Sequence, residues 1–265
     1  MRSWKTTTSE ARSKPTVRYE VDGAVVTVTI DRSEVRNAVD PKTAGALYDA
    51  FNEFDADDRL AVAVLTGSGG NFCAGFDLKA LAVEPSGYVT EDRGPMGPTR
   101  MNLSKPVLAA VEGYAVAGGL ELALWCDFRI AASSATLGVF NRRFGVPLID
   151  LGTVRLPRMV GQGRALELIL TGRPVKADEA LRIGLVERIA EPGRALEDAQ
   201  RVAREIAAFP SAGLRADRKS VLAQWSMSID DAARNEHRGG AAVIASGEAR
   251  EGARRFAEGE GRHGS

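Results

Sequence analysis

Residues 105–131 read KPVLAAVEGYAVAGGLELALWCDFRIA, and this stretch decides the fold. Its run of five apolar residues, 107–111, predicts a short buried strand. Gly113 then permits a turn, small residues follow, and Ala117-Gly118-Gly119 leads into a helix. The stretch therefore predicts a strand, a turn and a helix, with glycine where the helix begins.

The same plan occurs once earlier in the chain. Residues 61–65 predict a second buried strand, and FCAGFDL (72–78) again places an aromatic residue, small residues and Ala-Gly before a helix. Between the two units, 83–106 is rich in proline, glycine and charge, which is typical of a lid or a disordered insert. Both interpretations of that loop remain open.

A hairpin and several helices complete the pattern. Strand-like runs on either side of Asp22-Gly23 predict a β-hairpin, and Asp40-Pro41 predicts the start of an amphipathic helix over 41–56. From Thr153 onward helical periodicity dominates, interrupted by a strand at LVERI (185–189). Strands early and helices late predict an α/β core with a helical C-terminal part. We expect a flexible tail at 1–15, a core domain at 16–205, a helical region at 206–258 and a tail at 259–265.

Composition narrows the function classes. The 265 residues carry 35 basic and 35 acidic side chains, and this zero net charge argues against binding to nucleic acid or to a membrane surface. The longest uncharged stretch contains too many glycines to span a membrane. Only two cysteines and no signal peptide predict a cytoplasmic protein. With only two histidines, neither a histidine triad nor a histidine-ligated metal site is expected, so acid–base chemistry falls to carboxylates.

Two backbone amides are candidates for binding an oxygen atom. Glycines that open a helix leave N–H groups exposed, which makes Gly118 one candidate, and Phe76, which follows Ala74-Gly75, is the other. If the two units lie side by side, both donors aim at one oxygen and form an oxyanion hole. The alternative is that these glycines only allow tight packing. Neither a phosphate loop nor a dinucleotide fingerprint is complete.

Several stretches, in order, resemble the crotonase (enoyl-CoA hydratase/isomerase) family. They are NFCAGFDLKAL (71–81), residues 105–131, the spaced FG…GT…RL segment (144–156) and LTGRPVKADEALRIGLVERI (170–189). The resemblance covers residues 17 to about 257. It implies a crotonase-like α/β superhelix of stacked ββα units with a C-terminal helical region, assembled as a homotrimer or hexamer. It also implies an acyl-CoA substrate, fatty acid metabolism and no cofactor beyond coenzyme A as part of the substrate.

The resemblance also implies roles for individual residues. Phe76 and Gly118 would polarise the thioester. Glu121 would act on a water molecule, as one of two glutamates does in family hydratases. The residues expected along coenzyme A are Ala38, Ala74, Asp77, Leu78 and Lys79.

The second family glutamate is missing, because its position falls at Asn141. Asparagine orients a water molecule but does not relay a proton at neutral pH. Asp150 is the nearest spare acid, and it either exchanges a proton or only caps the helix after Leu151. Likewise, Glu121 is either catalytic or only favoured by the dipole of its own helix.

The resulting prediction is an enoyl-CoA hydratase-like enzyme that adds water to a 2,3 double bond or removes it. Two alternatives stay open. One is another acyl-CoA reaction on the same scaffold, namely thioester hydrolysis, dehalogenation, carbon–carbon cleavage or isomerisation. The other is an acyl-CoA-binding protein without activity.

Overall fold

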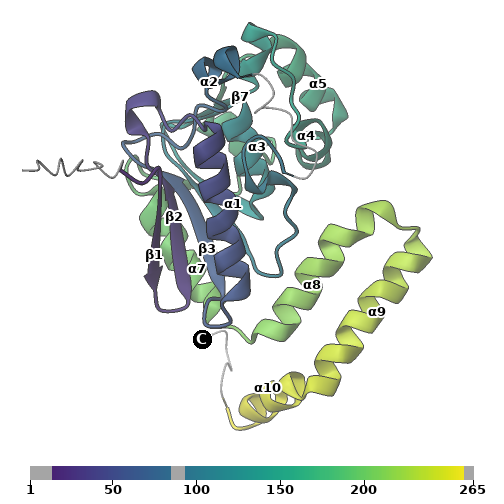
Figure 1. Ribbon diagram of the computed structural model, residues 1–265. Helices are drawn as coiled ribbons and strands as arrows, with labels where there is room; N and C mark the ends of the chain where they lie inside the picture. Colours follow the sequence, from purple (N-terminus) through teal and green to yellow (C-terminus); the bar gives the residue numbers. More distant parts are fainter. Residues whose placement is uncertain (1–13, 85–92, 260–265) are drawn as a thin grey trace, which may run out of the picture.

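The computed structural model describes residues 14–84 and 93–259, and a β-sheet forms its centre (Figure 1). Within these residues, six strands pair in the order β1-β2-β3-β4-β6-β9. The β1–β2 hairpin is antiparallel, and the other neighbours are parallel. The strands are β1 (Val17–Asp22), β2 (Val25–Ile30), β3 (Val62–Gly67), β4 (Val107–Val111), β6 (Phe128–Ala132) and β9 (Arg188–Ala190).

Successive side chains in the central strands face two different cores, as the period of a strand requires. In β4, Leu108 and Ala110 pack against the apolar face of helix α7 (Ala195–Ala207). Val107, Ala109 and Val111 belong to the larger core on the other face, which includes α1 (Pro41–Ala56). Both faces are covered, so the central strands read as continuous apolar runs.

A smaller sheet lies above the first and carries the helices of the repeated unit. Its described strands are β5 (Tyr114–Val116), β7 (Thr136–Gly138) and β8 (Val175–Lys176), and a parallel bridge between Cys73 and Ala115 extends it. α2 (Leu78–Val83) follows the first unit and α3 (Gly118–Trp125) follows the second. The stacked strand–strand–helix architecture is therefore as predicted.

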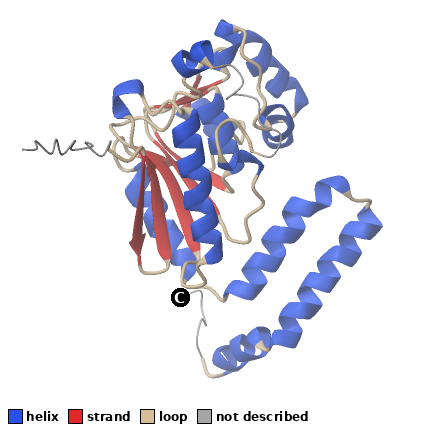
Figure 2. Ribbon diagram, viewed as in Figure 1, coloured by secondary structure: helices blue, strands red, loops and turns tan. Residues whose placement is uncertain are grey.

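The remaining helices divide into two groups (Figure 2). α4 (Gly152–Val160), α5 (Gln162–Thr171) and α6 (Ala177–Arg182) pack on the body. α8 (Ser211–Ala223), α9 (Ile229–Ser246) and α10 (Glu248–Ala257) form an arm that stands away from it. Short 3-10 turns lie at Ser33–Val35, Pro98–Arg100, Phe140–Phe144 and Gln224–Ser226.

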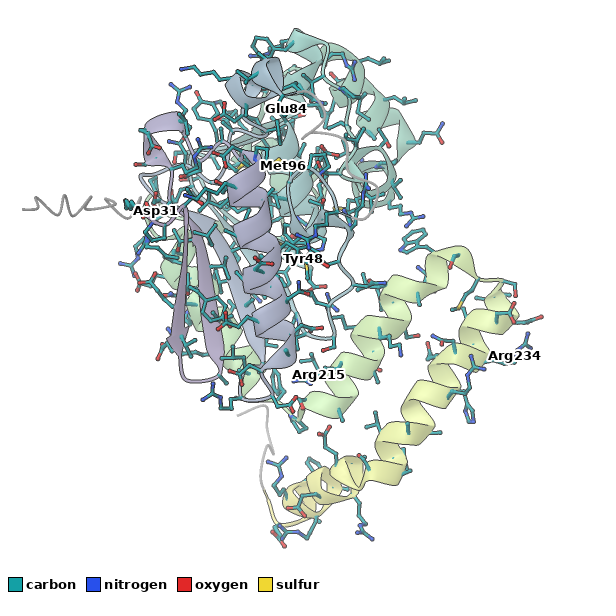
Figure 3. The ribbon with its side chains drawn as sticks, in the orientation of Figure 1. Asp31, Tyr48, Glu84, Met96, Arg215 and Arg234 are labelled. Carbon is teal, nitrogen blue, oxygen red and sulfur yellow. The ribbon has the colours of Figure 1, made fainter. Side chains whose placement is uncertain are left out.

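None of the described residues in α8, α9 and α10 is buried. Figure 3 shows Arg215 and Arg234 on this arm and Met96 inside the body. Arg218 ties the arm to the body, because its guanidinium contacts Asp127 at 2.8 Å and the carbonyl of Leu103 at 2.6 Å. The arm thus leaves apolar side chains exposed in a single chain.

Several local predictions are confirmed. The hairpin turns at Asp22-Gly23, and the Asp40 side chain caps α1 by accepting the Thr43 N–H at 2.8 Å. The strand expected at 185–189 is shifted toward the C-terminus, because β9 begins at Arg188. Leu185 lies before this strand and is buried in the core. α7 ends at Ala207, a few residues beyond the boundary expected between core and helical region.

The loop at 83–106 also differs from a simple lid. Its residues 85–92 lie outside the described residues, as do most of the two expected tails. Its second half, 93–106, packs into the body, where Met96 and Thr99 are fully buried. Apolar and small side chains in this half explain that packing, although they show no periodicity.

Candidate active site

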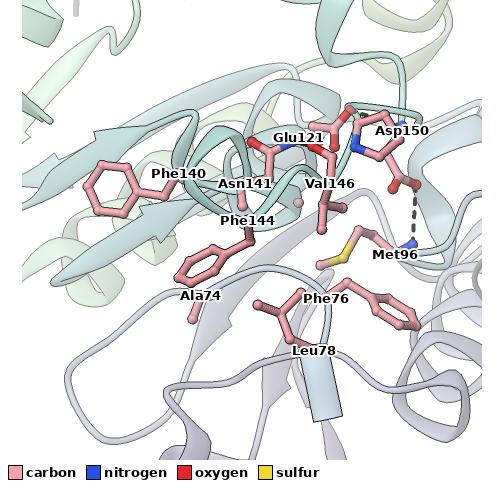
Figure 4. Close-up of a pocket in the computed structure, with 13 residues that line it drawn as sticks. Ala74, Phe76, Leu78, Met96, Glu121, Phe140, Asn141, Phe144, Val146 and Asp150 are labelled. Carbon is pink, nitrogen blue, oxygen red and sulfur yellow. Dashed lines mark hydrogen bonds between the residues drawn. The ribbon is translucent and has the colours of Figure 1, made fainter. Parts of the chain in front are cut away.

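A cavity of about 70 Å³ lies where the two repeated units meet the segment around α4 (Figure 4). Its wall is mainly apolar, and its polar side chains are Glu121, Asn141 and Asp150. The other lining residues are Ala74, Phe76, Leu78, Met96, Ala117, Gly118, Phe140, Phe144, Val146 and Pro147. Buried carboxyls in an apolar cavity are the usual mark of a site built for proton transfer.

Phe76 and Gly118 come side by side because the two repeated units run in parallel. The Cys73 N–H donates to the Tyr114 carbonyl at 2.8 Å, and the Val116 N–H donates back to Cys73 at 3.1 Å. Continuing that register three residues past Cys73 places Phe76 beside Gly118, and both line the cavity. Their closeness also shows at Gly75, where a Cβ atom would lie 3.0 Å from the Gly118 nitrogen.

A strained residue aims the start of α3. Ala117 has φ 53° and ψ −126°, a conformation that L-residues rarely adopt. Gly118 directly follows it as the first residue of α3, where amides have no acceptor within the helix. The turn at Ala117 therefore presents an available N–H at the cavity wall.

The Glu121 carboxylate lies at the start of a different helix from its own. Its Oε1 accepts hydrogen bonds from the N–H of Asp150 at 2.9 Å and of Gly152 at 2.8 Å, at the N-terminus of α4. The side chain is buried, and this burial, with the nearby charge of Asp150, raises its pKa to about 8. Glu121 is therefore held by backbone amides of the α4 segment as well as lying in the first turn of α3.

Asp150 does not cap the helix that follows it, so that interpretation is wrong. Leu151 occupies the cap position of α4, and its side chain makes no capping hydrogen bond. The Asp150 Oδ1 instead accepts the Met96 N–H at 3.2 Å and the Thr99 hydroxyl. Burial raises the pKa of Asp150, while these hydrogen bonds oppose the rise.

Arg155 connects the two segments that carry Asp150 and Thr99. Its guanidinium donates to the Asp150 carbonyl at 3.1 Å and to the Thr99 carbonyl at 2.7 Å. Its positive charge also lowers the pKa of both Glu121 and Asp150 against the effect of burial. The amino-acid sequence did not predict site roles for Met96, Thr99 and Arg155. Only Arg155 had a signal, because it belongs to the spaced family segment at 144–156.

Asn141 presents an acceptor at the cavity wall. Its Nδ2 donates to the Val146 carbonyl at 3.0 Å, which fixes the amide plane. Its Oδ1 is buried and has no hydrogen-bond partner among the residues that the structure describes. A buried acceptor of this kind is usually satisfied by water or by a ligand.

Of the residues expected along coenzyme A, two line the cavity, and Ala38, Asp77 and Lys79 are not among its lining residues. Ala74 and Leu78 line it, and Ala38 lies next to Val39, whose N–H donates to Gly75 at 2.8 Å. The Asp77 carboxylate is held by Arg32 at 3.1 Å and by the N–H of Lys79 at 3.0 Å, so it orders the turn. The Lys79 side chain is exposed.

Among the aromatic side chains, Phe140 and Phe144 line the cavity and Phe72 lies in the core. Arg143 lies over the Phe140 ring at 3.8 Å and donates to the Gly172 carbonyl at 3.1 Å. No group of three or more His, Cys, Asp or Glu side chains within 14–84 and 93–259 is arranged to hold a metal ion. In the same part of the chain, every helix is too short or too polar to cross a membrane.

Solved structures share this architecture. An enoyl-CoA hydratase from Mycobacterium tuberculosis H37Rv superposes with a TM-score of 0.88 at 39% sequence identity, covering 92% of this chain and 96% of that one. At this similarity the fold is the crotonase fold, with its C-terminal helical region. The stacked units and the cavity between them are therefore those of this fold class.

The family follows from the sequence comparison. The model of the enoyl-CoA hydratase/isomerase family matches residues 20–263, so the chain belongs to that family. It is 35% identical over 244 residues to enoyl-CoA hydratase EchA19 of Mycobacterium tuberculosis, covering 89% of this chain and 91% of the relative. It is also 35% identical over 224 residues to carnitinyl-CoA dehydratase of Salmonella arizonae, covering 82% and 84%.

Proposed function

We propose that this enzyme adds water to the 2,3 double bond of an acyl-CoA thioester, or removes it. The observation that carries the proposal is the pair of buried carboxyls, Glu121 and Asp150, in the cavity that Phe76 and Gly118 also line. Relatives named as a hydratase and a dehydratase support this class of reaction, which is the addition or removal of water. No metal or redox group has a role in this proposal, and coenzyme A enters as part of the substrate.

The two amides stabilise the charge that develops on the thioester oxygen. When water adds at C3, the electrons of the double bond move toward the carbonyl and form an enolate. Phe76 N–H and Gly118 N–H then donate to that oxygen, which is worth roughly 3 kcal/mol for each donor. Coenzyme A lies along Ala38, Ala74 and Leu78, with Lys79 near its phosphates.

The carboxyl pair moves the two protons. One carboxyl takes a proton from the water as its oxygen bonds to C3, and the other gives a proton to C2 as the enolate collapses. The reaction thus returns the pair to one shared proton. The charge of Asp150 raises the pKa of Glu121, so the two carboxyls titrate together. Each of the two titration steps therefore belongs to the pair rather than to one residue alone. The free Asn141 Oδ1 accepts a hydrogen bond from the attacking water.

Isomerisation is the second candidate, because Glu121 and Asp150 place two carboxyls at one cavity. A proton moved from C2 to C4 needs carboxyls but no oriented water, and Asp150 with Glu121 would supply them. This reaction differs from hydration in its product, because no water is incorporated.

We propose that the arm formed by α8, α9 and α10 joins copies of the chain into a trimer or hexamer. Apolar side chains on the arm support this, because they are more exposed than a stable single chain requires. Those side chains are Val221 (62% exposed), Leu222 (46%), Trp225 (53%), Ile244 (67%) and Phe256 (60%). A cytoplasmic location and a place in fatty acid metabolism remain predictions. Two buried free thiols support the location.

The decisive experiment compares products from a short 2-enoyl-CoA such as crotonyl-CoA. We expect loss of the conjugated enoyl absorbance without release of free thiol, and incorporation of labelled water into the product. Thiol release without hydration would establish thioester hydrolysis instead. Conversion of a 3-enoyl-CoA without water uptake would establish isomerisation. Tight binding without turnover across the panel would leave a binding protein.

A further inference from the structure

The two oxygens of Asp150 have different surroundings. Within the part of the chain that the structure describes, both hydrogen bonds to the side chain reach Oδ1, from the Met96 N–H at 3.2 Å and from the Thr99 hydroxyl. Gly94 packs closely against the same atoms, because a Cβ at this position would collide with both the Thr99 hydroxyl and the Asp150 Oδ1. Oδ1 is thus enclosed by residues 94–99, whereas no hydrogen bond to Oδ2 occurs among the described residues, and Asp150 lines the cavity.

The Thr99 hydroxyl is itself held in place. Thr99 is fully buried, and its carbonyl accepts from Arg155 at 2.7 Å. The other nitrogen of that guanidinium donates to the Asp150 carbonyl at 3.1 Å. One side chain therefore holds the backbone of both partners, and this keeps the segment of Thr99 beside that of Asp150.

We propose that Thr99 is a positioning residue, whose hydroxyl holds Oδ1 of Asp150 so that Oδ2 exchanges the proton with substrate. This inference rests on the proposed function, in which Asp150 takes part in proton transfer. Its chemical basis is that a hydroxyl donor satisfies one carboxylate oxygen and leaves the lone pairs of the other for the reacting proton. It also favours the ionised carboxylate, since a donor stabilises negative charge.

The charged groups around Asp150 come from three elements. Glu121 of α3 adds negative charge, whereas Arg100 of the 3-10 turn and Arg155 of α4 add positive charge. These three remain when only the Thr99 hydroxyl is removed. A change in the protonation of Asp150 on that removal can therefore be assigned to the hydrogen bond.

The test measures kcat and KM against pH for Thr99→Val, Thr99→Ser and the wild type. We expect Thr99→Val to move the acid limb of the profile upward by about one pH unit, because a hydrogen bond that stabilises the charged form is lost. We also expect kcat to fall about 10-fold, with KM changed less than two-fold. Thr99→Ser keeps the hydroxyl and should restore both the limb and kcat.

Thr43→Val is the matched control. Thr43 is also buried, but its hydroxyl has no partner among the described residues and lies outside the cavity lining. It should leave the profile unchanged. If Thr99→Val does not fold, Thr99→Ala carries the same prediction, because it also removes the hydroxyl.

Two results would overturn the inference in different ways. An unchanged acid limb in Thr99→Val, or equal damage in Thr99→Ser, would overturn the role of Thr99 while the proposed function stands. Full activity of Asp150→Asn would instead remove Asp150 from proton transfer, and the inference would fall with that part of the proposed function.

Discussion

Glu121 and Asp150 interact through a backbone hydrogen bond as well as electrostatically. The Glu121 Oε1 accepts the N–H of Asp150 at 2.9 Å, so the carboxyl of one residue is held by the main chain of the other. The side chain of Asp150 turns away from that contact toward Met96 and Thr99. The Glu121 side chain of α3 is thereby tied to the segment that carries Asp150 and leads into α4.

Activity should follow a bell-shaped pH profile. Because the pKa of Glu121 is raised to about 8, the pair holds one proton near neutral pH and loses it on the alkaline side. We expect the alkaline limb of kcat/KM near pH 8. Glu121→Gln should lower kcat by about 10²- to 10⁴-fold, as loss of a general acid or base does. A flat profile between pH 6 and pH 9 would contradict this assignment.

Glu121→Gln should also stabilise the protein. The folded pKa lies above the usual value of 4.5, so between pH 4.5 and about 8 the folded state binds more protons than the unfolded state. The free energy of unfolding of the wild type should therefore fall as pH rises through that window. Denaturant titrations at pH 5 and pH 9 should show the advantage of the variant growing by about 4 kcal/mol. An advantage independent of pH would mean that Glu121 is ionised throughout.

Gly152→Ala should disturb the Glu121 carboxylate without touching the substrate. A Cβ at Gly152 would lie 2.7 Å from the Glu121 Oε1 and 2.8 Å from its Cγ, so the carboxyl must shift. We expect kcat to fall about 100-fold, because a displacement of about 1 Å has that effect on a placed catalytic group.

Gly163→Ala is the control for this glycine substitution. Gly163 lies in α5, and no atom lies within 4 Å of a Cβ there. It should keep full activity and gain about 0.5–1 kcal/mol of stability, as glycine replaced in a helix does. Equal loss of activity in both variants would show that the contact with Glu121 is not the cause.

The arm should determine the oligomeric state. Light scattering of the wild type should give three or six times the mass of one chain. Leu222→Glu places a charge among the exposed apolar side chains of α8 and should lower that mass. Glu236→Lys, at an exposed position of α9, should leave it unchanged. A wild type that stays monomeric at micromolar concentration would contradict the role given to the arm.

The elements that could be predicted from sequence are those with a local signal. The apolar run at 107–111 and the Asp40-Pro41 helix start depend on neighbours in the chain, and both are where expected. The strands of the small sheet are two or three residues long, too short for a period to show. The sequence does not indicate that the arm stands away from the body. The helical patterns of α8, α9 and α10 would be the same if these helices packed on the body of their own chain.

The residues of the candidate site also divide into those that the sequence predicts and those that it does not. Glu121, Asn141 and Asp150 could be singled out because their residue types and order are informative, and the structure brings all three to one cavity. Thr99 could not be found, because it lies 51 residues from Asp150 in a loop without periodicity. The true partners of Glu121 were equally hidden, since backbone N–H groups have no sequence signature.

The strained turn at Ala117 carries a consequence for evolution and engineering. A non-glycine residue at φ 53° and ψ −126° costs roughly 1–3 kcal/mol, which glycine would recover. Selection for thermal robustness alone would replace Ala117, and a consensus or directed-evolution campaign scored on melting temperature would favour the same change. The neighbouring amide would then sample more directions, so heat resistance gained at this position would be lost again in turnover.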